Sequence, residues 1–124
     1  MEPVRVLIVD DEHELVSALE ERLALRGFVT RGVTDGAAAL ECLRTTTFDV
    51  VLADVKMPGI GGLDLARTIN AERPDVPVVL LTGASSPQDA ASGSTLGAFD
   101  YLVKPVKIDD LARVLCAAAR REQP

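Results

Sequence analysis

The sequence of 124 residues predicts an α/β fold in which five parallel strands alternate with helices along the chain. Short runs that are almost wholly apolar recur at intervals, and strands covered on both faces of a parallel sheet have that composition. Amphipathic segments separate these runs, with leucines and alanines three or four residues apart, as in helices that lie against a sheet. Five such repeats form a doubly wound sheet within one domain of residues 1–124.

The expected strands are short, and three of them are almost entirely apolar. They are Val4–Val9, Phe28–Val33, Asp49–Ala53, Pro77–Leu81 and Asp100–Val103. The first helix follows from the four-residue spacing of Leu15, Leu19 and Leu23, and Gly27 provides its stop.

Capping residues and apolar spacing predict the other helices. Thr34 and Asp35 begin the second helix, since Asp is a favoured N-cap. The third helix ends before Pro74, because the residue before a proline avoids helical dihedral angles. The fourth, over Ser86–Leu96, is expected to be short or mobile, since an interior glycine costs roughly 1 kcal/mol relative to alanine. Apolar spacing marks the third helix at Leu63, Ala66 and Ile69, and the last helix at Ile108, Leu111, Leu115 and Ala118. Residues 120–124 are expected to be a frayed tail or the start of a linker.

Composition and charge exclude several classes of function. The net charge of -6 argues against direct binding of nucleic acid by this chain, and is compatible with a cation or a basic partner. No signal peptide and no run long enough to cross a bilayer are present, so we expect a cytoplasmic protein without a membrane partner. Cys42 and Cys116 lack metal-binding spacing and are expected to be buried, reduced side chains.

Polar side chains stand at the carboxyl ends of four of the five expected strands. Asp10 and Asp11 follow the first, Asp54 ends the third, Thr82 follows the fourth and Lys104 the fifth. Parallel strands bring their carboxyl ends to one edge of the sheet, which is where such folds bind ligands. We therefore expect these five side chains to lie close together.

Three carboxylates at one edge repel one another. Two unit charges about 4 Å apart interact by roughly 4 kcal/mol at an effective dielectric constant of 20. A divalent cation offsets this cost, and a small set of hard oxygen ligands suits Mg²⁺, which shares its coordination shell with a phosphate group. A hydroxyl and an ammonium group can hold the remaining phosphate oxygens, and a carboxylate can itself accept a phosphoryl group. Capping of the first helix would explain one aspartate after the first strand but not two.

Four sequence segments, in this order and spacing, resemble the receiver (phosphoacceptor) domain of bacterial two-component response regulators. They are LIVDDE, DVVLADVKMPGIGG, LLTGAS and GAFDYLVKP, and the resemblance covers essentially the whole chain. It implies a flavodoxin-like (βα)5 fold with strand order 2-1-3-4-5.

The resemblance also implies a role for each residue at the carboxyl edge. Asp54 matches the phosphoryl acceptor, Asp11 the direct Mg²⁺ ligand and Asp10 the acid that holds the ion through water. The backbone carbonyl of Lys56 would be a further ligand, and Mn²⁺ is an expected substitute for Mg²⁺.

Four more positions match the part of the site that contacts and senses the phosphoryl group. Thr82 and Lys104 resemble the pair that contacts it, and Tyr101 the switch aromatic. The bond between Lys104 and Pro105 would be cis, which costs only about 0.5–1 kcal/mol for a proline.

The implied function is a phosphorylation-controlled signalling switch. A sensor histidine kinase or a phosphotransfer protein would donate the phosphoryl group, and the face made by the fourth helix, the fifth strand and the last helix would change. The domain would not be an enzyme beyond slow autophosphorylation from small phosphodonors and slow autodephosphorylation. A downstream output domain or protein is expected as a partner. Phosphorylation-dependent dimerisation is left open, as is the choice between the receiver part of a longer transcriptional regulator and a stand-alone phosphorelay receiver.

Two other classes of function rank lower. A flavodoxin-like cofactor binder needs aromatic side chains beside its flavin, whereas aromatics make up 3% of this chain and the first loop is acidic. A Mg²⁺-dependent aspartyl-phosphate hydrolase typically has a second acid two residues after its nucleophile, where this chain has Lys56.

Overall fold

The computed structural model describes residues 3–57, 59–83 and 99–120, which form one five-stranded parallel sheet with helices on both faces. The strand order is β2-β1-β3-β4-β5, as predicted. The strand bounds differ from the expected ones by at most one residue. They are β1 (Arg5–Val9), β2 (Val29–Val33), β3 (Val50–Asp54), β4 (Val78–Thr82) and β5 (Asp100–Val103).

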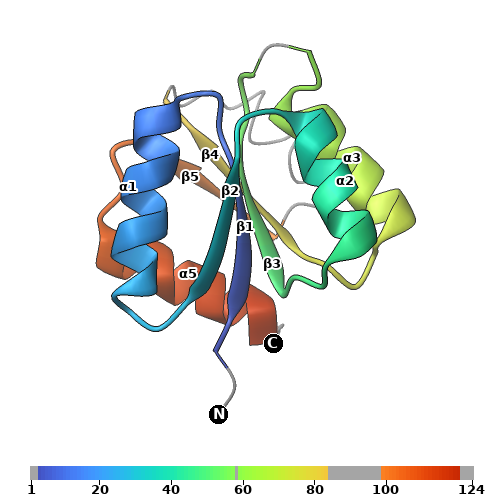
Figure 1. Cartoon of the computed structure of the whole chain (residues 1–124). Coiled ribbons are helices and arrows are strands. Elements are labelled where there is room, and N and C mark those ends of the chain that lie inside the picture. The colour runs from blue at the N-terminus through green and yellow to red at the C-terminus, as the bar shows by residue number, and fades with distance from the viewer. Residues whose placement is uncertain (1–2, 58, 84–98, 121–124) are drawn as a thin grey trace.

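The helices cover the sheet in two layers. Helices α1 (His13–Ala24) and α5 (Ile108–Arg120) lie on one face, and α2 (Gly36–Thr45) and α3 (Gly62–Glu72) lie on the other (Figure 1). The segment expected as the fourth helix lies outside the described residues.

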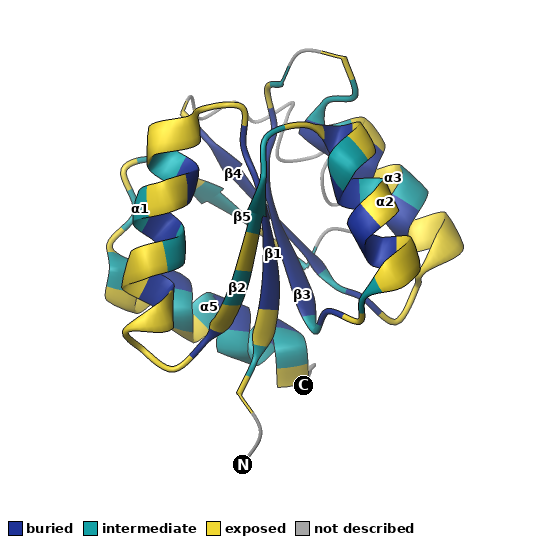
Figure 2. Ribbon diagram, in the orientation of Figure 1, coloured by how far each residue is buried: buried dark blue, intermediate teal, exposed yellow. Residues whose placement is uncertain are grey.

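Alternate residues of the central strands supply two separate apolar cores. Val6 and Ile8 belong to the core under α1 and α5, whereas Leu7 and Val9 belong to the core under α2 and α3. Every residue of β3 and β4 is buried, as is all of β1 except Arg5 (Figure 2). This confirms that the apolar runs are strands covered on both faces.

Strand register brings the polar strand ends to one edge. Val9 pairs with Ala53, Asp54 with Leu81, and Thr82 with Val103. Asp10 follows Val9 directly, so it emerges from the edge beside Asp54. The carboxyl ends of β1, β3, β4 and β5 therefore converge at the same place.

The helix ends follow the predicted signals. Gly27 has a φ of 91°, a left-handed conformation that glycine adopts readily, three residues after α1 ends. Asp35 is the N-cap of α2, and its Oδ1 accepts a hydrogen bond from the Ala38 amide at 2.7 Å. Helix α3 ends at Glu72, before Pro74.

Two expectations about the last helix were wrong. Cys116 is half-buried rather than buried, because the buried stripe of α5 consists of Leu111, Leu115 and Ala118, and Cys116 lies beside that stripe. Arg120 is the last residue of α5 rather than part of a frayed tail. Cys42 is buried as expected, and both thiols are free. Within the described ranges, no helix is long and apolar enough to cross a membrane.

Replacing the N-cap of α2 tests this account of its start. Asp35→Ala should lower the free energy of unfolding by about 1 kcal/mol, because the Ala38 amide loses its acceptor. Asp35→Asn keeps an acceptor oxygen and should retain most of the stability. Urea unfolding measures both, and equal losses in the two variants would contradict a capping role.

Candidate functional site

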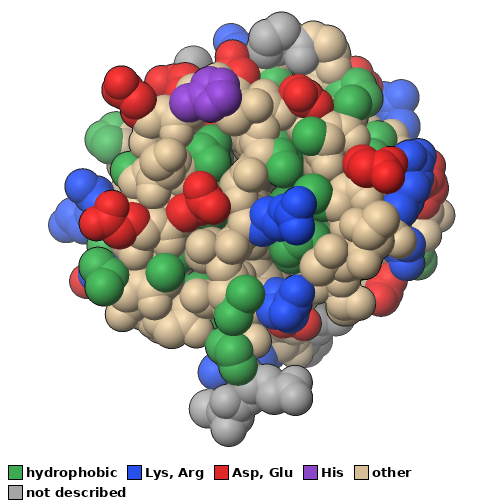
Figure 3. All heavy atoms as spheres, viewed as in Figure 1, with side chains coloured by type: hydrophobic (Ala, Val, Ile, Leu, Met, Phe, Trp, Pro, Cys, Tyr) green, Lys and Arg blue, Asp and Glu red, His purple; other side chains and the backbone are tan. Residues whose placement is uncertain are grey.

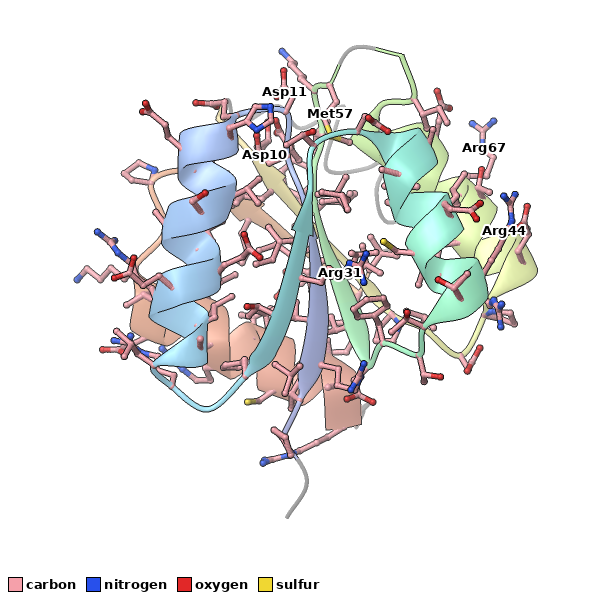
Figure 4. The ribbon with its side chains drawn as sticks, in the orientation of Figure 1. Asp10, Asp11, Arg31, Arg44, Met57 and Arg67 are labelled. Carbon is pink, nitrogen blue, oxygen red and sulfur yellow. The ribbon has the colours of Figure 1, made fainter. Side chains whose placement is uncertain are left out.

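Three carboxylates meet at the carboxyl edge of the sheet. Asp10 and Asp11 come from the loop between β1 and α1, and Asp54 is the last residue of β3. One carboxylate oxygen of each lies within 4.8 Å of the other two. Asp10 and Asp54 are buried, with 2% and 7% exposed, whereas Asp11 is exposed. Figure 4 shows Asp10 and Asp11 at the upper end of β1.

Lys104, from the loop after β5, is the cation of this cluster. Its Nζ lies 3.2 Å from Asp10 Oδ2 and 3.9 Å from Asp54 Oδ1. Its backbone amide donates to the Thr82 carbonyl at 2.6 Å, so the end of β4 helps to position the lysine. The peptide bond between Lys104 and Pro105 is cis.

Asp10 uses its two carboxylate oxygens differently. Oδ2 accepts from Lys104, and Oδ1 accepts from the backbone amide of Glu12 at 3.0 Å. Glu12 is the N-cap of α1 and its side chain makes no capping bond. Asp10 therefore orients the entry to α1, and its other oxygen faces the cluster.

Burial and charge perturb the two central groups. Burial raises the pKa of the Asp54 carboxyl, and the negative charge of Asp10 raises it further. The charge of Lys104 and the hydrogen bond from the Lys56 amide lower this pKa, but the net result lies above the ordinary value of an aspartate. Burial lowers the pKa of the Lys104 ammonium, but Asp10, Asp54 and Glu12 outweigh burial and raise it overall. One ammonium facing three carboxylates leaves the site short of positive charge.

The carboxylate cluster fits a divalent cation. Its ligand atoms are hard oxygens from three side chains, a set that suits Mg²⁺ with water and substrate oxygens completing the shell. Among the described residues, this is the one group of three or more potential metal-binding side chains. His13 is exposed at the surface near acidic side chains (Figure 3) and is not part of this group.

Thr82 and Tyr101 belong to the neighbouring strands β4 and β5. Thr82 is buried at the end of β4, and Tyr101 lies in β5 beside Leu80. Tyr101 packs against the core under α2 and α3, and its hydroxyl is buried without a hydrogen-bond partner in the part of the chain that the structure describes.

Sequence reasoning did not identify the contact between Glu12 and Lys104. Glu12 Oε1 lies 3.7 Å from Lys104 Nζ, although the Glu12 side chain is 67% exposed. Its place next to the aspartate pair was visible, but the approach of two residues so far apart in sequence depends on the tertiary fold.

Fold and site together define a class of protein. A doubly wound sheet of flavodoxin-like topology carries three acids, a threonine and a lysine at the edge where such sheets bind ligands. The sequence matches the family model described as the response regulator receiver domain over residues 6–115. The chain therefore belongs to the receiver domain family of two-component response regulators.

Curated relatives agree with this family. The chain is 34% identical to the response regulator MprA of Mycobacterium sp. (strain KMS), over 98% of this chain and 53% of that protein. It is 37% identical to the probable transcriptional regulatory protein TcrX of Mycobacterium tuberculosis, over 97% of this chain and 51% of that protein. The chain thus spans about half the length of the curated relatives it matches.

Solved structures show the same fold. The receiver domain of a Francisella response regulator matches with a TM-score of 0.89 and 28% identity, covering 97% of this chain and 99% of that one. A receiver domain from Clostridium thermocellum matches with a TM-score of 0.89 and 30% identity, covering 96% of both chains. The family assignment does not favour the cofactor-binding or hydrolase alternatives.

Removing the Asp54 charge should stabilise the metal-free protein. The pKa of folded Asp54 lies above 3.8, so its ionised form costs folding free energy at neutral pH. Asp54→Asn should raise the melting temperature at pH 7 by a few degrees in the presence of a chelator. The gain should shrink as pH falls through the folded pKa toward 3.8, since protonation then relieves the same cost in the wild-type protein.

The matched control for this experiment is Asp75→Asn, at an exposed loop position. It should leave the melting temperature unchanged. A melting temperature below wild type for Asp54→Asn at pH 7 would contradict the electrostatic account of the cluster.

Proposed function

We propose that this chain is a phosphorylation-controlled switch that accepts a phosphoryl group on Asp54. The observation that carries the proposal is the buried Asp54 carboxylate, which lies among Asp10, Asp11 and Lys104 at the open edge of the sheet. A carboxylate oxygen of Asp54 would attack phosphorus in line, forming an O–P bond as the bond from phosphorus to the donor breaks. The donor group leaves with the electron pair of that bond.

The acidic cluster supplies the binding groups for a divalent cation. Asp11 would bind Mg²⁺ directly, Asp10 would hold it through water, and Asp54 and the Lys56 carbonyl would complete the protein ligands, with Mn²⁺ as a substitute. When bound, the cation offsets negative charge on the phosphoryl oxygens during transfer.

Lys104 and Thr82 would hold the phosphoryl group. Lys104 already lies 3.9 Å from an Asp54 oxygen and is bonded to Asp10, so a small movement would bring its ammonium to a phosphoryl oxygen. Thr82 lies at the end of the neighbouring strand, and its hydroxyl can donate to a second oxygen.

Tyr101 would report the state of the site to the rest of the domain. Its buried hydroxyl has no partner among the described residues, which supports a side chain that exchanges between two arrangements. Phosphorylation would draw Thr82 inward, and Tyr101 would follow. The surface affected would be the fourth helix, β5 and α5, of which the fourth helix lies outside the described residues.

A sensor histidine kinase or a phosphotransfer protein would be the phosphodonor, and an output domain or protein the downstream partner. Residues 1–124 would form one receiver domain, with slow autophosphorylation and autodephosphorylation as its own chemistry. Two relatives are named as transcriptional regulatory proteins and are about twice as long, which supports the receiver part of a longer transcriptional regulator. A stand-alone relay receiver is the second candidate.

Intact mass measurement tests the acceptor. Wild-type protein incubated with acetyl phosphate and Mg²⁺ should gain one phosphoryl group, and should gain none with a chelator. Asp54→Asn should gain none, whereas Asp64→Asn, exposed on α3, should behave as wild type. An adduct retained in Asp54→Asn would refute Asp54 as the acceptor.

The role of Lys104 predicts a rate effect. Lys104→Ala should slow phosphoryl uptake roughly 100-fold, since one preorganised charge contact to the transferred group is lost. Lys107→Ala removes an exposed lysine three residues away and should leave the rate unchanged. Equal rates for wild type and Lys104→Ala would contradict the contact.

The buried hydroxyl of Tyr101 predicts a small effect on stability. Tyr101→Phe should change the free energy of unfolding by less than about 0.5 kcal/mol or raise it, because no hydrogen bond to a described residue is lost. Tyr101 is the only tyrosine and tryptophan is absent, so the intrinsic fluorescence of the protein comes from Tyr101. If Tyr101 changes its environment on phosphorylation, this fluorescence should change. A fluorescence that stays constant while the mass adduct forms would count against the switch role.

A further inference from the structure

Gly62, the first residue of α3, lies against the backbone of the candidate acceptor. Its amide donates to the Val55 carbonyl at 2.9 Å, and the residue is buried. A Cβ at this position would lie 2.1 Å from the Asp54 carbonyl oxygen and 2.7 Å from both the Asp54 carbonyl carbon and Val55 Cα. All three atoms belong to the backbone, so no side-chain rotation can make room.

Among the glycines that the structure describes, no other shows this combination. A Cβ on Gly61, the preceding residue, would meet only the Val55 carbonyl oxygen at 3.4 Å, an ordinary contact. A Cβ on Gly32, in β2, would lie 2.2 Å from Val16 Cγ1 and 2.9 Å from Glu20 Cδ, but both atoms belong to side chains of α1 rather than to the Asp54 peptide. Within the described ranges, Gly62 is the one glycine at which the clash would fall on the peptide that carries Asp54.

The peptide between Asp54 and Val55 is held from two sides. The Val55 amide donates to the Leu81 carbonyl of β4 at 2.9 Å, and α3 covers the other side through Gly62. The Cβ of an alanine at position 62 would have to lie at least 3.0 Å from the Asp54 carbonyl oxygen, whereas the present backbone leaves only 2.1 Å. Either the peptide or the first turn of α3 would therefore have to move. The Lys56 amide lies 3.4 Å from Asp54 Oδ1, so Asp54 and Lys56 belong to the same turn of the chain. A movement of this turn would displace both residues.

We propose that Gly62 is a positioning residue, whose missing side chain lets α3 fix the Asp54 carboxylate and the Lys56 carbonyl relative to the cation and phosphoryl sites. The proposal rests on the proposed function of Asp54. Misplacement of a reacting group by about 1 Å can slow a reaction roughly 100-fold. The role differs from that of a helix-starting glycine, because a Cβ here would clash with backbone atoms of Asp54 and Val55.

Three single substitutions separate positioning from stability. Gly62→Ala should weaken Mg²⁺ binding at least about tenfold and slow phosphoryl uptake from acetyl phosphate roughly 100-fold, even at saturating Mg²⁺ and acetyl phosphate. Gly61→Ala should stay within about twofold of wild type. Gly32→Ala should lower the melting temperature, yet bind Mg²⁺ and take up phosphoryl within about twofold of wild type. All measurements are made well below each melting temperature, with folding verified by circular dichroism.

Two outcomes would overturn the proposal. One is a folded Gly62→Ala protein with wild-type Mg²⁺ affinity and uptake rate. The other is a Gly32→Ala protein that loses both as severely as Gly62→Ala, since that result would assign the effect to general destabilisation. The carboxyl ¹³C signal of Asp54 should also shift in Gly62→Ala and not in Gly61→Ala. This signal needs no phosphoryl transfer, so a wild-type protein that accepts no phosphoryl group would refute the proposed function separately.

Discussion

The repulsion among carboxylates at the carboxyl edge is the constraint on which the site depends. Asp10 and Asp54 are both buried, and Lys104 is the cation that lies within 4 Å of each. Burial in a medium less polar than water strengthens the repulsion and the attraction alike. The site therefore has a deficit of positive charge, and this is the electrostatic environment that the proposed cation and phosphoryl group would enter.

The sheet tolerates this arrangement because strand pairing and apolar packing fix the positions of the strand ends. Three fully or largely buried strands form two apolar cores, and their register sets the spacing between the strand ends. Asp10 and Lys104 also have a second anchor in the backbone. Asp10 accepts from the Glu12 amide, and the Lys104 amide donates to the Thr82 carbonyl. Burial of apolar side chains thus stabilises a site that would be unfavourable on its own.

The same anchors connect the site to the rest of the molecule. Lys104 reaches the cluster from the loop between β5 and α5, so its position depends on both elements. Its backbone bond to Thr82 joins that loop to β4, and Tyr101 lies beside β4 in the next strand. Under the proposed function, a change of charge at Asp54 would act on β4 and β5 through these contacts.

The sequence by itself determined the fold class, the strand order through family resemblance, and the five residues gathered at the edge. These features depend on local pattern: apolar runs, helical spacing, and the residue type that follows each strand. Strand ends were misplaced by one residue at most, since hydrogen bonding rather than composition decides where pairing stops. Only the tertiary structure decided that Asp10 is buried while Asp11 is exposed, that Glu12 approaches Lys104, and that a side chain at position 62 would clash with the Asp54 carbonyl. Each of these depends on how elements distant in sequence pack together, and no local pattern encodes such distances.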